Sequence, residues 1–348
     1  MASNRIEYID GLRGFTIILV VYSHIVSLLT STPPLLSNVN SIFITFRMPL
    51  FFFISGYFVY NYKYDIELFR KRSMNRLIRQ LYPTIVFWML FCICFMGCKF
   101  SLTDEYKSGY WFTFVSIEMF FLIAPLFIIF SSKKLSKFIQ VSILILIGIL
   151  CIGILYIALK TGCVHTNAIW KGFSLSLLFS YMPFLLFGAV FKIQSHAWLK
   201  YTTHIYTLIS AIAIYILAKF YLLGFIATLI QGFTGIIIIH YIFFHLFNID
   251  KFKHSLFSQK LQFIGKKTLE IYLLHYFFIN ILKQIPHIPQ QIYGIINTNY
   301  ELPLCLCLSL AIAYICLGTI KLMKKLKIYN LLFPSTIDRF KTIYILSK

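Results

Sequence analysis

Residues 138–159 read FIQVSILILIGILCIGILYIAL and contain no charged side chain. A helix needs about 20 mostly apolar residues to cross the roughly 30 Å of hydrocarbon in a bilayer, so this stretch predicts a membrane-spanning helix. The rest of the chain has a similar character, because 59% of its 348 residues are hydrophobic and only 12% are charged. Soluble proteins have about 25% charged residues, so the composition excludes a soluble globular fold.

The same standard of length and hydropathy predicts about ten spanning helices along the chain. They are expected at residues 12–30, 42–60, 81–98, 110–130, 139–158, 172–191, 203–222, 225–247, 268–285 and 303–322. An even number of spans places both termini on one side of the membrane. The sequence therefore predicts an all-α, polytopic transmembrane helix bundle, with a membrane domain at residues 1–322 and a basic cytoplasmic tail at residues 323–348.

The basic residues predict which side of the membrane is cytoplasmic. The formal charge is +21, from 32 Lys and Arg against 11 Asp and Glu. A nucleic-acid-binding protein gathers such charges on a water-facing surface, whereas here they lie between long apolar runs, so we expect no nucleic-acid partner. With both termini in the cytoplasm, the outer loops hold only Lys99, Lys107, Lys160 and Lys171. This positive-inside pattern predicts a multi-pass protein of the cytoplasmic (inner) cell membrane, with its basic tail against anionic membrane lipid.

Two ionisable residues of the first predicted span, Arg13 and His24, lie on one helix face. Their spacing, at about 100° per residue, is close to three full turns, and the rise places them about 16 Å apart. Arg13 then lies at the cytoplasmic mouth and His24 past the middle of the span. An imidazole in a polar cleft at that depth is a candidate general acid or base. The alternatives are an interfacial anchor for Arg13 and an interhelical hydrogen bond for His24.

Further arginines lie at the cytoplasmic entrance and inside the second predicted span. Arg76 and Arg79 are spaced i, i+3 and share one helix face, and paired guanidinium groups suit phosphates as well as lipid headgroups. Arg47 lies too deep in its span to be a loop residue. The same span contains Pro49, which breaks a regular helix, and Gly56, which allows close packing. These features predict the wall of a water-containing cavity.

The remaining polar residues inside spans are candidates for substrate contact. Glu118 lies about two turns into the fourth predicted span, where it is expected either to neutralise Arg47 or to orient His24. Tyr272 precedes His275 by one turn on the same face of the ninth span. Substrate contact and interhelical hydrogen bonding both fit that pair.

Four motifs in this sequence resemble those of the acyltransferase family 3 membrane proteins. YIDGLRG at residues 8–14, followed by an apolar run to His24, resembles the opening signature of the family. MPLFFFISGY at residues 48–57, RLIR at residues 76–79 and IGKKTLEIYLLH at residues 264–275 resemble its second-span, cytoplasmic Arg-x-x-Arg and late-span motifs. The motifs follow the family order. Arg47 is a departure, because the family more commonly has His before the Met-Pro pair.

The resemblance implies a membrane acyltransferase domain over residues 1–322 that uses acetyl-CoA, or another acyl-CoA, as cytoplasmic donor. It implies transfer of the acyl group, most often acetyl, to a hydroxyl of a glycan or lipid-linked sugar at the outer face. By resemblance His24 is the catalytic histidine, and the donor is bound by Arg13, Arg76 and Arg79. No metal is expected, because the eight cysteines lack the spacing of metal ligands.

Within that resemblance, we expect His24 to remove the proton of the acceptor hydroxyl while Arg47 or Tyr57 lies near the oxyanion. A transient acyl-His24 intermediate is the alternative mechanism. Glu118, Tyr272 and His275 are the residues expected to bind the acceptor substrate. The rival function is a transporter or flippase with polar side chains along a permeation path.

Overall fold

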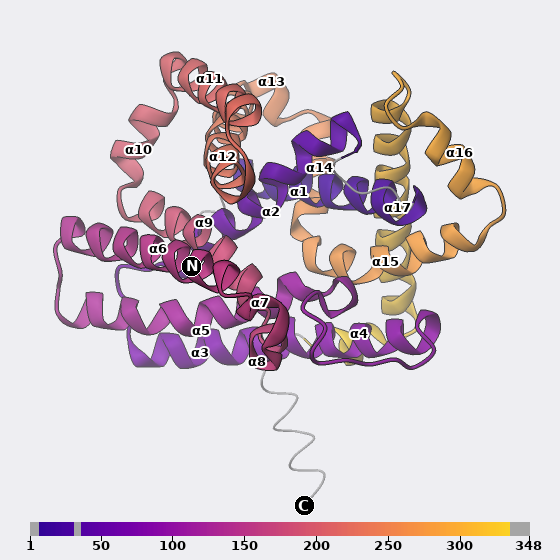
Figure 1. The fold of residues 1–348 in the computed structure, drawn as a ribbon, viewed down its shortest axis with the longest axis horizontal. Helices are drawn as coiled ribbons and strands as arrows, with labels where there is room; N and C mark the ends of the chain where they lie inside the picture. The colour runs from indigo at the N-terminus through magenta and orange to yellow at the C-terminus, as the bar shows by residue number, and fades with distance from the viewer. Residues whose placement is uncertain (1–6, 31–35, 335–348) are drawn as a thin grey trace, which may run out of the picture. The chain divides into compact units, whose positions relative to one another are not determined.

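The computed structural model describes residues 7–30 and 36–334; the last part of the predicted tail, residues 335–348, lies outside the described residues. Within the described residues all regular structure is helical, which confirms the all-α class (Figure 1). The chain divides into two compact units. Unit 1 comprises Met1–Tyr57 and Gln194–Leu317, and unit 2 comprises Phe58–Ile193 and Gly318–Lys348.

A helix coincides with each of the ten predicted spans. In the described part of the chain, eight helical stretches are long and apolar enough to cross a membrane: Glu7–Leu29, Asn38–Val59, Ile66–Phe95, Trp111–Ser132, Lys137–Lys160, Leu175–Ile193, Gly224–Asn248 and Glu301–Lys325. Ile205–Tyr221 is apolar but shorter, and Thr268–Gln284 has Glu270 in its first turn. The polytopic membrane bundle is confirmed, while ten spans and cytoplasmic termini stay predictions.

Unit 1 contains the first helix, most of the second and much of the C-terminal half of the chain. Its helices are α1 (Glu7–His24), α2 (Asn38–Val59), α10 (Ser195–Thr202), α11 (Ile205–Tyr221), α12 (Gly224–Asn248), α13 (Asp250–Lys253), α14 (Leu256–Lys266), α15 (Thr268–Gln284), α16 (Ile288–Ile295) and the first part of α17 (Glu301–Lys325). In Figure 1, α11 lies beside α12 and α1 passes along α14.

Two facing glycines let α1 and α14 touch backbone to backbone. A Cβ added to Gly14 would collide with the carbonyl oxygen of Leu261, and a Cβ added to Gly265 would collide with that of Asp10. Small residues at helix crossings permit this close approach in membrane bundles. Because the obstacles are backbone atoms, no side-chain movement relieves them, and the crossing fixes the position of α1 within unit 1.

We expect Gly14→Ala to lower the unfolding midpoint of the detergent-solubilised protein by several degrees, because overpacking costs about 1–3 kcal/mol or more. The measurement is thermal unfolding followed by light scattering or intrinsic fluorescence. Gly153→Ala is the matched control, since nothing lies within 4 Å of a Cβ at Gly153 and alanine favours a helix over glycine. Equal midpoints for the two variants would contradict the close crossing.

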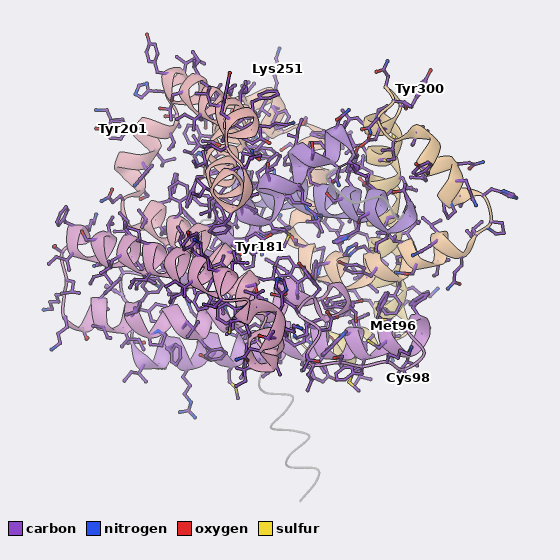
Figure 2. The ribbon with its side chains drawn as sticks, viewed as in Figure 1. Met96, Cys98, Tyr181, Tyr201, Lys251 and Tyr300 are labelled. Atoms are coloured by element: carbon purple, nitrogen blue, oxygen red, sulfur yellow. The ribbon has the colours of Figure 1, made fainter. Side chains whose placement is uncertain are left out.

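Unit 2 contains the central helices of the chain. Its helices are α3 (Ile66–Arg76), α4 (Tyr82–Phe95), α5 (Trp111–Ser132), α6 (Lys137–Lys160), α7 (Cys163–Thr166), α8 (Ala168–Gly172), α9 (Leu175–Ile193), the end of α17 and α18 (Tyr329–Leu332). α5 packs on α3 and α9, and α6 packs on α9 (Figure 1). Figure 2 labels Tyr181 of α9, whose ring stacks on that of Trp111 in α5 with centroids 5.3 Å apart.

Candidate active site

His24 is the last residue of α1, and a π-helix over Ile25–Leu29 starts directly after it. Single π-helical turns inside α-helices are rare, and they occur frequently at functional sites. The residues that flank His24 are buried, whereas residue His24 is part-exposed. The local backbone therefore places a histidine with some solvent exposure at the end of a buried helix.

The His24 ring lies against two consecutive side chains of α15. Its Nε2 atom is 2.9 Å from the hydroxyl oxygen of Tyr276, and its ring centroid is 5.3 Å from that of His275. The rings of His275 and Tyr276 have centroids 4.3 Å apart, and both residues are buried. In this cluster, His24 is thus the ring that a substrate can reach.

The second histidine of the cluster has a fixed tautomer. Nδ1 of His275 is 3.2 Å from the backbone oxygen of Ile271, and a carbonyl oxygen only accepts, so Nδ1 carries the hydrogen. Nε2 of His275 is then a hydrogen-bond acceptor. This atom is buried and has no hydrogen-bond partner among the described residues. A buried polar atom in this state costs free energy, and a donor group on a ligand would remove that cost.

Arg47 of α2 brings a positive charge to the same cluster. It is 8% exposed, and its guanidinium group donates to the backbone oxygen of Val20 at 3.3 Å. The charge acts electrostatically on His24, His275 and Tyr276. Charges interact more strongly in a buried site than in water, so Arg47 is suited to stabilise negative charge that develops beside His24.

Two other predicted residues of unit 1 lie at different distances from His24. The Tyr272 ring centroid is 5.8 Å from that of His275, so Tyr272 belongs to the cluster. Arg13 is part-exposed and lies about 16 Å before His24 along α1. That separation leaves room between the two side chains for the extended arm of a ligand.

Tyr57 is not brought to His24. It interacts electrostatically with Tyr8, near the start of α1, whereas His24 ends that helix. The helical rise between Tyr8 and His24 is about 24 Å. Of the two residues predicted near the oxyanion, only Arg47 lies in the His24 cluster.

The two arginines of the RLIR motif have different surroundings in unit 2. Arg76 ends α3, and Arg79 lies in a second π-helix, Leu77–Leu81, which joins α3 to α4. The Arg76 guanidinium carbon is 4.4 Å from the ring centroid of Phe120, while Arg79 is exposed. The prediction of a shared face assumed regular α-helical geometry, and the π-helix replaces that geometry at this motif.

Arg72, which the sequence analysis did not single out, fixes α3 to the end of α2. It donates to the backbone oxygens of Val59 at 2.7 Å and Phe58 at 3.3 Å. The last carbonyl groups of a helix lack partners within the helix, and Arg72 donates to two of them. Its guanidinium carbon also lies 5.2 Å from the ring centroid of Tyr64. Arg72 therefore has a structural role beside the predicted donor-binding arginines.

Lys107 is a buried cation in the loop before α5. Its Nζ donates to the backbone oxygens of Leu102 at 3.0 Å, Asp104 at 2.7 Å and Lys171 at 3.2 Å. Burial lowers the pKa of the Lys107 ammonium group, and the nearby carboxylates of Asp104 and Glu118 oppose that effect. Lys107 thus joins its own loop to α8 within unit 2 and brings a positive charge close to Glu118.

Glu118 interacts electrostatically with Lys107 of the same unit. From sequence, Lys107 is expected only to be a loop residue. One carboxylate oxygen of Glu118, Oε2, is buried and has no hydrogen-bond partner in the described ranges. Arg47 and His24 belong to unit 1. The predicted pairing of Glu118 with either of them stays a prediction.

A buried carboxylate that the sequence analysis missed lies at the start of α17. Glu301 is fully buried and follows Tyr300, which Figure 2 labels. Its carboxylate accepts hydrogen bonds from the Tyr22 hydroxyl at 3.0 Å, from the Asn297 backbone N–H at 2.7 Å and from the Ser37 hydroxyl. Three donors compensate for the burial of this charge.

The Glu301 network reaches the residues directly before His24. The Ser23 hydroxyl donates to the side-chain oxygen of Asn40, and the Asn40 backbone N–H donates to Ser37 at 2.9 Å. Tyr22 and Ser23 are therefore both held by the network. A glutamate at the edge of a span looks like an interfacial residue in sequence, and its hydrogen-bond donors come from distant parts of the chain.

Comparison with known proteins identifies the family of the chain. The model of the acyltransferase domain of acyltransferase family 3 matches residues 6–318. The match includes every predicted site residue and most of both units. Neither the curated proteins nor the solved structures contain a match to the chain.

Proposed function

Because the chain belongs to acyltransferase family 3 and is a multi-pass membrane acyltransferase, we propose that it transfers an acetyl group from cytoplasmic acetyl-CoA to a hydroxyl. The proposed acceptor is a glycan or lipid-linked sugar at the outer face of the cytoplasmic membrane. The supporting observation is the buried cluster of His24, His275, Tyr276 and Arg47. It combines part-exposed His24 with a hydrogen-bond acceptor, Nε2 of His275, that has no donor among the described residues. Arg47 adds a positive charge.

In the proposed reaction His24 is the general base. It takes the proton of the acceptor hydroxyl while the hydroxyl oxygen attacks the thioester carbon. The carbonyl oxygen becomes negatively charged in the tetrahedral intermediate, and Arg47 stabilises that charge. When the carbon–sulfur bond breaks, the proton passes from His24 to the sulfur of coenzyme A. Tyr57 has no part in this proposal, since it lies with Tyr8.

Arg13, Arg76 and Arg79 are the proposed donor-binding residues. Coenzyme A has phosphate groups at one end and the thioester at the end of a long arm. Guanidinium groups bind phosphate oxygens through paired hydrogen bonds. Arg13 lies about 16 Å from His24 along α1, a separation that supports its proposed contact with the phosphate end while the thioester reaches His24.

The acceptor-binding part of the proposal involves His275, Tyr272 and Glu118. Nε2 of His275 accepts hydrogen bonds and has no donor among the described residues, so a hydroxyl of the acceptor suits it. Sugars have several hydroxyl groups. One of them donates to His275 while another loses its proton to His24, whose ring centroid is 5.3 Å away.

We expect His275→Asn to raise KM for the acceptor about fivefold and to leave KM for acetyl-CoA unchanged. Asparagine keeps a donor near the Nδ1 position but removes the acceptor at Nε2, and one hydrogen bond is worth about 1 kcal/mol. His275→Gln, whose side-chain oxygen reaches the Nε2 position, is the matched variant and should retain a lower KM. The measurement is transfer of radiolabelled acetyl groups to increasing amounts of glycan extract. Equal acceptor KM values for both variants and the wild type would exclude this contact.

The proposed function is tested by two measurements on the protein in its membrane and in detergent. Surface glycans of cells that make the protein should contain more O-acetyl groups than those of cells lacking it, and purified protein should consume acetyl-CoA when glycan extract is added. If the purified protein consumes no acetyl-CoA but moves a glycan across vesicles, the proposal fails and a transporter is indicated.

A further inference from the structure

The hydrogen bond between His24 and Tyr276 involves one imidazole nitrogen of His24 and leaves the other to exchange a proton with a substrate. Nε2 of His24 is 2.9 Å from the Tyr276 hydroxyl oxygen. Tyr276 is 4% exposed, whereas His24 is part-exposed. The nitrogen of His24 that remains to meet a substrate is therefore Nδ1.

The direction of this hydrogen bond decides whether His24 acts as a base. A neutral imidazole carries one hydrogen, on either nitrogen. If the hydrogen is on Nε2, that N–H donates to the Tyr276 oxygen and Nδ1 has a lone pair for the substrate proton. If Tyr276 donates to Nε2 instead, the hydrogen is on Nδ1, and that nitrogen accepts no proton.

Tyr276 is held in place by its neighbours on α15 and across the cluster. Its ring packs on His275 with centroids 4.3 Å apart and on His24 with centroids 4.8 Å apart. The hydroxyl oxygen therefore has a fixed position relative to the imidazole. A base that is oriented by a hydrogen bond from its second nitrogen is the arrangement found in catalytic triads.

We propose that Tyr276 is a positioning residue for His24, whose hydroxyl oxygen accepts the Nε2–H hydrogen bond and keeps Nδ1 unprotonated. This inference rests on the proposed function, in which His24 is the base. When Nδ1 takes the proton of the acceptor hydroxyl, the ring becomes positively charged. The hydrogen bond from Nε2–H to Tyr276 then strengthens, since charge-assisted hydrogen bonds are about twice as strong as neutral ones.

The first test compares Tyr276→Phe with Tyr215→Phe. Both remove only a tyrosine hydroxyl of unit 1 with a 2.9 Å hydrogen bond. The Tyr215 hydroxyl bonds to Thr45 of α2 at that distance and also donates to the backbone oxygen of Ile42 at 3.4 Å. Tyr276→Phe should lower kcat for acetyl transfer about tenfold to hundredfold while KM for acetyl-CoA stays unchanged. Tyr215→Phe should leave both constants unchanged. Equal kcat values for the two variants would overturn the inference.

The second test needs neither substrate nor a folded variant of Tyr276. Protein with ¹⁵N-labelled histidine is studied in detergent by NMR, and the His24 signals are those lost in His24→Gln. The inference expects the hydrogen of neutral His24 on Nε2, and a hydrogen on Nδ1 would overturn it.

The two proposals fail in different ways. If His24→Ala keeps its activity, His24 is not the base and the proposed mechanism itself is wrong. If His24→Ala is inactive while Tyr276→Phe keeps full kcat, only the inference about Tyr276 is wrong.

Discussion

We expect His24→Ala to lower kcat for acetyl transfer by about 10⁴-fold, the upper end of what a positioned general base contributes. A sugar hydroxyl is a weak nucleophile until its proton is removed, and no other accessible imidazole lies in the cluster of unit 1 as described. KM for acetyl-CoA should stay unchanged, because the proposed donor contacts are arginines. The measurement is transfer of radiolabelled acetyl groups by the purified protein.

The matched control for His24→Ala is His245→Ala in α12. His245 likewise belongs to unit 1, and its Nε2 is 3.0 Å from the backbone oxygen of Thr203. Both variants remove an imidazole with one hydrogen bond, and only His24→Ala should lose activity. Undiminished acetyl transfer by His24→Ala would contradict general-base catalysis and the acyl-His24 alternative together.

The acyl-His24 alternative is separated from general-base catalysis by labelling without acceptor. An acyl-enzyme would retain radioactivity after incubation with labelled acetyl-CoA, and His24→Ala would not. General-base catalysis by His24 leaves no label on the protein, because the acetyl group passes directly to the acceptor oxygen. We expect no label.

The fold class could be predicted because the decisive signal is local. The charge-free stretch at residues 138–159 coincides with α6 (Lys137–Lys160). Boundaries were less predictable: the third span was expected from residue 81, yet the helical stretch there runs over Ile66–Phe95. The predicted span starts only after the charged residues that precede it. Arg, Lys, Met and Leu are good helix formers, so the helix begins earlier and runs through these residues.

The candidate site could be predicted only where a residue type is unusual for its environment. An imidazole inside an apolar span is unusual, so His24 and His275 were identified from sequence. A tyrosine in a span is ordinary, and the bond between Tyr276 and His24 joins residues 252 positions apart. Spacing along one helix gives no information on such a pair, although the i, i+4 spacing of Tyr272 and Tyr276 places these two tyrosines on one face of α15.

The π-helices also lay beyond sequence analysis. Both begin directly after a predicted functional residue, Ile25–Leu29 after His24 and Leu77–Leu81 after Arg76. A regular α-helix was the basis for placing Arg76 and Arg79 on one face, and no residue in RLIR marks the change of helix type.

We expect Arg47→Met to lower kcat by about 10²–10³-fold, the usual effect of removing one group that stabilises an oxyanion. Methionine approaches the length of the arginine stem but has neither the charge nor the hydrogen-bond donors. The guanidinium group is held at the cluster by its hydrogen bond to the backbone oxygen of Val20, so its charge is already in position when the thioester oxygen becomes negative. The measurement is kcat and KM for both substrates.

Arg47→Lys and Arg47→His distinguish what the site requires of this position. Lysine keeps the charge but lacks the planar fork of the guanidinium group, and histidine offers a ring N–H donor. Both should retain more activity than Arg47→Met if a donor to the oxyanion is what matters. An unchanged kcat with a raised acceptor KM in Arg47→Met would instead place Arg47 in acceptor binding, because an interaction made only in the transition state lowers kcat.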